Sequence, residues 1–178
     1  IIGEMIIEAG KDADWILLAQ RGEHFHFGEE GMLGSTAETV VRTSGKPVMV
    51  TPAAFREISA MVLAYDGSLP AGNALKIAAE LAAQTSWPLS VIIVAADQKK
   101  GVELSKQAET LLGAHQVKGR IDVVKGKEGR ELLRLAQGGA GELMIMGAYG
   151  HNRLRELILG STTSSLIRKS TIPVLLTR

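Results

Sequence analysis

The chain has 178 residues, with 20 Lys and Arg against 19 Asp and Glu, and it contains no cysteine. This length fits one domain, or one domain plus part of another. The lack of cysteine excludes disulfides, thiolate metal sites and cysteine nucleophiles. The net charge of +1 argues against a protein whose main partner is a nucleic acid. No apolar run approaches the roughly 20 residues that cross a bilayer, and no signal peptide opens the sequence, so we expect a cytoplasmic protein.

The first 52 residues read as two helix–strand pairs. An amphipathic helix pattern covers residues 2–10, and an apolar strand pattern covers residues 15–19. A second helix follows the triplet Gly34-Ser35-Thr36, and a short strand covers residues 48–50. The segment 53–56, which follows Pro52, reads as a linker.

From residue 57 onward, strands and helices alternate. Short and nearly continuous apolar runs are typical of strands that are covered on both faces. Five such runs are predicted, at residues 58–65, 89–96, 120–124, 143–146 and 173–176. Helical patterns lie between them, at residues 71–84, 100–112, 129–137 and 161–168. This alternation predicts an α/β fold, with a five-stranded parallel sheet, right-handed crossovers and helices on both faces.

An internal repeat connects the two parts. Residues 14–22 and 142–150 share an acidic residue, four apolar residues and a small-x-x-Gly ending, at an offset of 128. The triplet Gly34-Ser35-Thr36 matches Gly160-Ser161-Thr162, and Pro47 matches Pro173, both at an offset of 126. Residues 1–52 therefore read as the C-terminal remnant of a first unit, and residues 57–178 as a complete unit. If the units have equal length, the remnant lacks about 70 residues that should precede it.

The pattern Gly147-x2-Gly150-x9-Gly160-Ser161-Thr162 is the strongest chemical signal. Glycines after a buried strand let the backbone approach a ligand closely. A helix that begins with two hydroxyl residues is a ready site for a phosphate. The alternative is that the glycines only shape a turn and that Ser161 only caps the helix.

A second signal is Asp66, which follows the first strand of the complete unit. In parallel sheets, ligands bind beyond the carboxyl ends of the strands, and a carboxylate there can accept hydrogen bonds from ribose hydroxyls. Taken alone, an Asp-Gly-Ser sequence more often forms an Asx turn or a helix cap. Asp66 gains significance because it is predicted at the same edge of the sheet as the glycine loop.

These features together resemble the universal stress protein family. The resemblance rests on residues 62–68 (VLAYDGS), the glycine pattern and the ending Ile172-Pro173-Val174-Leu175, and it spans residues 57–178. It implies a Rossmann-like parallel sheet of strand order 3-2-1-4-5, and the glycine pattern is that of the ATP-binding branch. It also implies a set of adenine-nucleotide ligands: Ala64, Asp66 and Val94 at the adenosine, Met146, Gly147 and Gly150 along the ribose and phosphates, and Gly160, Ser161 and Thr162 at the phosphates.

The first unit departs from this pattern. Ala19 stands where the first glycine is expected, and eleven residues separate Gly22 from Gly34 instead of nine. The strand that would carry the aspartate is absent. Other candidates are weaker. The pair His24-x-His26 lacks a third metal ligand, and residues 126–130 lack the Lys-Ser/Thr ending of a phosphate loop. His151 could reach a γ-phosphate, but exposure to solvent is the simpler interpretation.

Three functions remain open from the sequence. The first is a sensor or regulator of the stress response that binds ATP, with or without Mg²⁺. The second is a slow ATPase. The third is an interaction scaffold whose glycine loop binds no nucleotide. No residue is placed as a general base, so binding without efficient turnover is favoured. The resemblance further implies that residues 48–50 pair near residues 174–176 as an internal pseudo-dimer. The open edge of the strand at residues 15–19 predicts a homodimer or higher oligomer.

Overall fold

The computed structural model describes residues 2–20, 35–54, 57–138, 142–148 and 161–178. Its elements follow in the order α1 (Ile2–Ala9), β1 (Ile16–Ala19), α2 (Ser35–Thr43), β2 (Val48–Thr51), β3 (Ala60–Ala64), α3 (Leu69–Thr85), β4 (Leu89–Ala95), α4 (Gln98–Ala114), β5 (Arg120–Lys125), α5 (Glu128–Gly138), β6 (Glu142–Gly147), α6 (Ser161–Lys169) and β7 (Val174–Thr177). The expected α/β alternation is therefore present.

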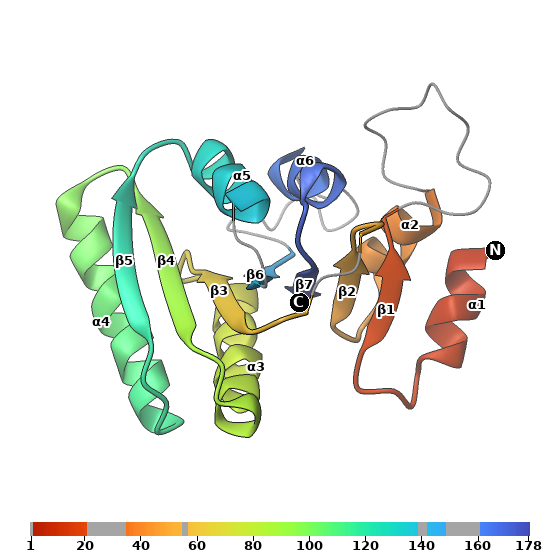
Figure 1. The fold of residues 1–178 in the computed structure, drawn as a ribbon, viewed down its shortest axis with the longest axis horizontal. Helices are drawn as coiled ribbons and strands as arrows, with labels where there is room; N and C mark the ends of the chain where they lie inside the picture. Colours follow the sequence, from red (N-terminus) through yellow and green to blue (C-terminus); the bar gives the residue numbers. More distant parts are fainter. Residues whose placement is uncertain (1, 21–34, 55–56, 139–141, 149–160) are drawn as a thin grey trace.

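One sheet crosses the whole molecule, in the order β1-β2-β7-β6-β3-β4-β5 (Figure 1). The prediction of a five-stranded, fully parallel sheet was wrong, because the sheet has seven strands and is mixed. The five strands from β3 to β7 run parallel to one another. The two N-terminal strands are parallel to each other and join this group through one antiparallel pairing, between β2 and β7.

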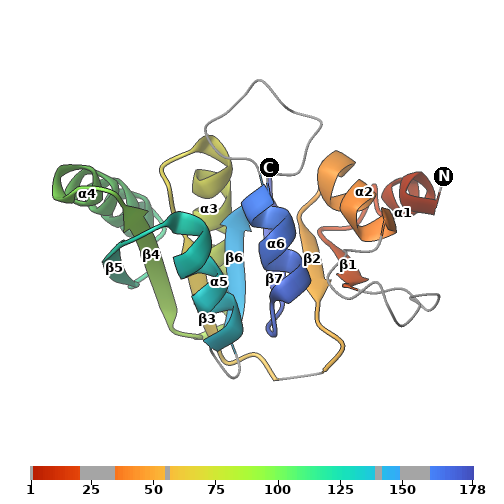
Figure 2. The same ribbon diagram turned by 90° about the horizontal axis from the view of Figure 1, so that it is seen from above.

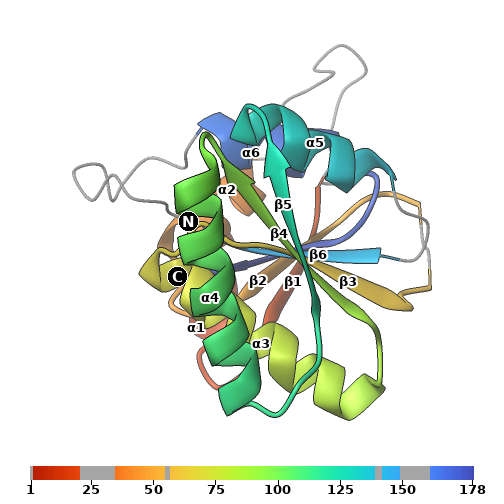
Figure 3. The ribbon, with the colours of Figure 1, turned by 90° about the vertical axis from the view of Figure 1, so that its left-hand side faces the viewer.

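Helices cover both faces of the sheet and enclose two aliphatic cores. Side chains of α1, α2, α5 and α6 pack in one core, and those of α3 and α4 pack in the other. Figure 2 shows α5, α6, α2 and α1 following one another along the sheet. Figure 3 shows α3 and α4 on the other side of the sheet from α5 and α6. No helix in the described part of the chain is long and apolar enough to span a membrane.

The antiparallel pairing of β2 with β7 is centred on positions that the predicted repeat equates. Met49 pairs with Leu175, and the flanking pairs are Val48 with Leu176 and Val50 with Val174. Since the offset of 126 relates Met49 to Leu175, the two strands exchange roles about this pair, as a two-fold axis requires. The expected contact of residues 48–50 with residues 174–176 is confirmed.

Hydrogen bonds recur at the same two offsets. The N–H of Ile16 donates to Pro47 O at 3.0 Å, and the N–H of Met144 donates to Pro173 O at the same distance. In each case the pairing of strands starts one residue further on, with Ile16 opposite Val48 and Met144 opposite Val174. The two stretches thus share this pattern of strand pairing, and the interpretation of residues 1–52 as the remnant of a first unit stays a prediction.

Candidate nucleotide-binding site

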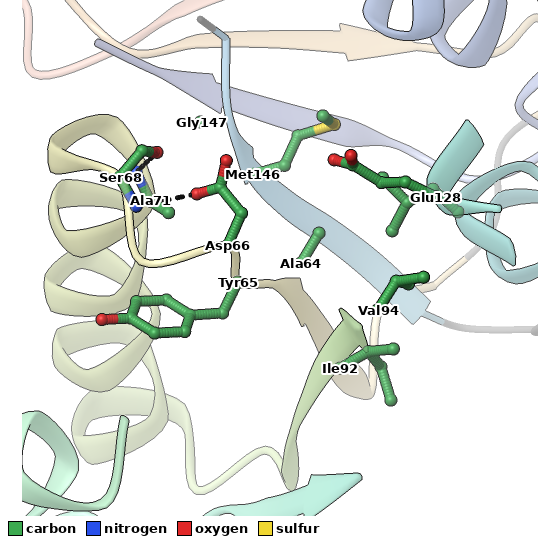
Figure 4. Close-up of a pocket in the computed structure, with 11 residues that line it drawn as sticks. Ala64, Tyr65, Asp66, Ser68, Ala71, Ile92, Val94, Glu128, Met146 and Gly147 are labelled. Carbon is green, nitrogen blue, oxygen red and sulfur yellow. Dashed lines mark hydrogen bonds between the residues drawn. The ribbon is translucent and has the colours of Figure 1, made fainter. Parts of the chain in front are cut away.

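A pocket opens where the carboxyl ends of β3, β4 and β6 meet the first turns of α3 and α5 (Figure 4). This is the edge at which open parallel sheets bind ligands. Its lining contains five of the nine residues expected to bind a nucleotide: Ala64, Asp66, Val94, Met146 and Gly147. The other lining residues are Tyr65, Ser68, Ala71, Ile92, Glu128 and Leu132.

Asp66 lies in the loop between β3 and α3, with its carboxylate toward the pocket (Figure 4). Its Oδ1 accepts a hydrogen bond of 2.9 Å from the N–H of Ser68. Ser68 in turn caps α3, because its Oγ accepts from the N–H of Ala71 at 3.3 Å. Gly67, between them, has a φ of +78°, which glycine adopts without strain. The aspartate thus forms the Asx turn that the sequence left open, and it also lines the pocket.

Tyr65 precedes this turn and stays a neutral phenol. Burial of the ring is the main cause, and the neighbouring Asp66 carboxylate is a second one; both raise the pKa of Tyr65. The phenol is therefore no proton acceptor near neutral pH, and the acidic groups of the described lining are Asp66 and Glu128.

Gly147 ends β6, and a close contact requires a glycine there. A Cβ at this position would lie 2.8 Å from Pro70 Cβ and 2.9 Å from the backbone nitrogen of Ala71. Real Cβ atoms do not approach so closely, so the first turn of α3 packs directly on the end of β6. The glycine has a sufficient structural reason, and this contact also fixes the distance between the Asp66 loop and β6.

The walls of the pocket are aliphatic. Ala64, Ile92, Met146 and Leu132 are all at least nine-tenths buried, and Val94 is half-buried beside them. Such walls suit the faces of a flat, weakly polar ring. The described lining contains no Lys or Arg, so this part of the pocket suits an uncharged group better than a phosphate.

Glu128 was not predicted as a binding residue, although it lies in residues 126–130, the weak phosphate-loop candidate. It is the first residue of α5 and lines the pocket, and Figure 4 shows its side chain reaching in from the side opposite Asp66. An acid in the first turn of a helix is commonly explained by the helix dipole alone. The useful signal was its position four residues after the end of the predicted strand at residues 120–124.

The residues expected to bind phosphates are described only in part. Thr162 lies in the first turn of α6, and its Oγ1 is 3.4 Å from where a Cβ of Gly129 would stand. The first turns of α5 and α6 are therefore neighbours, and Thr162 lies close to the pocket although it does not line it. Ser161 begins α6. Gly150 and Gly160 lie outside the described residues, as do His24, His26 and His151.

A metal site of protein ligands has no support in the described ranges, where no three His, Asp or Glu side chains gather. Asp66 and Glu128 are the two carboxylates that could contact a cation carried into the pocket by a ligand.

Comparisons with known proteins identify the family to which the chain belongs. The model of the universal stress protein family matches residues 58–178. The chain belongs to the universal stress protein family. That match covers one family unit, and residues 2–51 lie outside it.

Relatives extend over most of the chain. It is 34% identical over 166 residues to the universal stress protein Slr1230 of Synechocystis, a match that covers 92% of this chain and 58% of that protein. A crystal structure of a universal stress protein from Archaeoglobus fulgidus aligns with a TM-score of 0.81 and 28% identity, over 99% of this chain and 66% of that one. The chain thus spans less than two thirds of the length of these relatives.

A further solved structure contains a bound nucleotide. It is a universal stress protein in complex with cAMP, which aligns with a TM-score of 0.56 and 20% identity, over 67% of this chain and 97% of that one. At this identity the likeness concerns the fold alone.

Proposed function

We propose that this universal stress protein binds an adenine nucleotide, with ATP as the main ligand, and acts as a sensor or regulator in the stress response. The observation that carries the proposal is the pocket at the carboxyl edge of the sheet, which brings together Ala64, Asp66, Val94, Met146 and Gly147. The resemblance had selected these residues from three separate stretches of the chain.

The chemistry of the pocket fits the nucleoside end of the ligand. The base lies between the aliphatic walls, and Asp66 accepts hydrogen bonds from the ribose hydroxyls. The phosphates leave toward α6, where Gly150, Gly160, Ser161 and Thr162 provide backbone N–H groups and hydroxyls. Mg²⁺ arrives bound to the phosphates. The complex of a relative with cAMP is compatible with a nucleotide site in this fold.

Binding without efficient turnover is the favoured form of this function. Hydrolysis needs a group that positions or deprotonates the attacking water. Asp66 is engaged in its turn with Ser68, and Glu128 is exposed at the start of α5. Neither arrangement is that of a buried general base.

We also propose that residues 2–51 are a divergent counterpart that binds no nucleotide. Ala19 takes the place of Gly147, and this region has no counterpart of β3 or of Asp66 among the described residues.

The experiment is a thermal-shift series with ATP, ADP, AMP and adenosine, followed by an assay of phosphate release. Ligands that bind the folded state raise the melting temperature. We expect all four to raise it, with little release of phosphate. Rapid release would establish an ATPase instead, and the absence of any shift at millimolar ligand would favour the scaffold.

A further inference from the structure

The last turn of α2 lies at the same edge of the sheet as the pocket. α2 ends at Thr43 and leads through a short turn into β2, which starts at Val48. Val48 lies opposite Leu176 in the antiparallel pair of β2 and β7. The next residue of β7, Thr177, pairs with Gly147 of the pocket. The end of α2 and the start of β2 therefore reach the carboxyl edge at which the pocket opens.

α2 also lies on the face of the sheet that carries the pocket. One core holds Val40 and Val41 of α2, Leu166 and Ile167 of α6, and the pocket residue Met146. Figure 2 shows α2 next to α6 along this face. The first turn of α6 lies beside the first turn of α5, at the carboxyl edge. The last turn of α2 and the first turn of α6 are thus at the same end of two neighbouring helices.

The side chain of Gln20, which follows β1, shows how close the two regions come at the opposite edge. Its Nε2 donates to Ile167 O and Ser170 O, both at 2.8 Å, at the end of α6. The two-fold relation of β2 and β7 carries Gln20 onto Ala148 and the end of α6 onto the end of α2. Ala148, the residue after Gly147, therefore lies beside the last turn of α2, and it shares a core with that helix.

Arg42 lies in this last turn. Its side chain is half-buried and its Nε is buried, so the guanidinium is held against the protein. Arg168, its counterpart at the offset of 126, lies in the last turn of α6 and also has a buried Nε. Both cations favour the C-terminal end of their helix. Because α6 ends where β7 starts, Arg168 lies at the edge of the sheet opposite the pocket, whereas Arg42 lies at the pocket's own edge.

A cation at this place complements the charge of the pocket. The described lining has two carboxylates, Asp66 and Glu128, and neither Lys nor Arg. With the ribose at Asp66 of β3, the sheet order β3-β6-β7-β2 puts each further phosphate nearer to α2. The planar guanidinium of an arginine suits phosphate oxygens, with which it forms paired hydrogen bonds. Lys127 and Arg130, beside Glu128, are exposed instead.

We propose that Arg42 binds the terminal phosphates of the nucleotide held by residues 57–178. Residues 2–51 then hold no nucleotide of their own but contribute one cation to the neighbouring site. This inference rests on the proposed function, because it needs a nucleotide in the pocket. Its consequence is that Arg42 strengthens the binding of ATP and not that of AMP or adenosine.

The test is isothermal titration of ATP, AMP and adenosine into the wild type, Arg42→Ala and Arg42→Gln. We expect both variants to bind ATP about tenfold more weakly or worse, since each loses a charge-assisted hydrogen bond to phosphate. Their affinities for AMP and adenosine should stay within about twofold of the wild type. Arg42→Gln keeps most of the length of the side chain, so it supplies the result if Arg42→Ala does not fold.

Arg168→Ala is the matched control. It removes the same cation from the last turn of the corresponding helix, so it should lower the melting temperature as Arg42→Ala does. Its affinity for ATP should stay within about twofold of the wild type. Arg42→Lys keeps the charge but not the fork of donors, so its affinity for ATP should lie between those of the wild type and Arg42→Ala.

Three results would overturn this inference while leaving the proposed function in place. The first is a folded Arg42 variant that binds ATP as tightly as the wild type. The second is an equal loss of ATP and adenosine binding in both Arg42 variants, because the arginine would then act only on the structure. The third is a loss of ATP binding in Arg168→Ala as large as that in Arg42→Ala. Wild-type protein that binds none of the three ligands would overturn the proposed function and this inference together.

Discussion

Leu17 and Ile145 occupy corresponding places in two regions of similar local structure, yet one is 61% exposed and the other is fully buried. Each follows an acidic residue and two large apolar residues, and each lies on a strand that pairs in parallel with the last strand of its region. The difference comes from β3, which pairs with β6, and from α3, which packs on β6 and β7. Local sequence thus determines where the strand forms, whereas the burial of its side chains and the presence of a pocket depend on residues distant in the sequence.

The same neighbours decide which region has a pocket. β3 brings Asp66 to the end of β6, and the first turn of α3 packs on Gly147. In the N-terminal region, Ala19 is exposed at the edge of the sheet. Paired substitutions at corresponding positions therefore test the comparison directly.

The largest contrast is expected for the two glycines that precede the hydroxyl pairs. Gly160→Val should abolish ATP binding with little loss of folding, because a side chain would fill the proposed phosphate site. Gly34→Val should leave ATP binding unchanged. Isothermal titration measures both, and circular dichroism checks the fold. Wild-type affinity in Gly160→Val would refute the assignment of the phosphate site.

The next contrast concerns stability. Ile145→Ala should lower the free energy of unfolding by about 2–5 kcal/mol, since it leaves a cavity in a closed core. Leu17→Ala should lower it by less than about 0.5 kcal/mol, since that side chain is mostly exposed. Urea denaturation measures both values. Equal losses at the two positions would show that β1 is covered in solution.

Gly147→Ala and Ala19→Gly form a smaller pair. The new Cβ at residue 147 would displace Pro70 and Ala71, at a cost of about 1–3 kcal/mol, and the shift should widen the pocket and weaken adenosine binding. Ala19→Gly should cost at most about 1 kcal/mol. A fully stable Gly147→Ala protein would contradict the close packing of α3 on β6.

Two serines should behave alike. Ser44 Oγ accepts from the N–H of Lys46 at 3.0 Å, and Ser170 Oγ accepts from that of Ile172 at 3.2 Å. Both side chains are buried, so Ser44→Ala and Ser170→Ala should each lower stability by about 1–3 kcal/mol, the cost of leaving a buried partner unsatisfied. Thermal unfolding of the two variants provides the comparison. A large difference between them would weaken the proposed repeat.

Much of this fold follows from sequence patterns because its strands are short, apolar and separated by helices. The pairing of residues 48–50 with residues 174–176 also followed, through the repeat and the family resemblance. The number of strands in the sheet did not. The five-strand prediction treated the complete unit by itself, whereas β2 adds its own region to the same sheet through β7.

The site was predictable where a residue type is unusual for its place. Asp66 and Gly147 stand at strand ends, where a carboxylate or a missing side chain attracts notice. Glu128 was missed because an acid at a helix start is ordinary, and only the packing of α5 beside β4 and β6 gives it a pocket to line. The helix after Asp66 begins at Leu69, two residues earlier than its apolar spacing indicated, because Ser68 caps it.

The most direct test of the central claim is a titration of adenosine and ATP into the wild-type protein and Asp66→Ala. If Asp66 holds the ribose, both ligands should bind the wild type, and both should weaken by about 1–3 kcal/mol in the variant, which is the cost of an unpaired polar group. Circular dichroism of Asp66→Ala controls for loss of the Asx turn. Wild-type protein that binds neither ligand, or a folded Asp66→Ala protein that binds both as tightly as the wild type, would contradict the account.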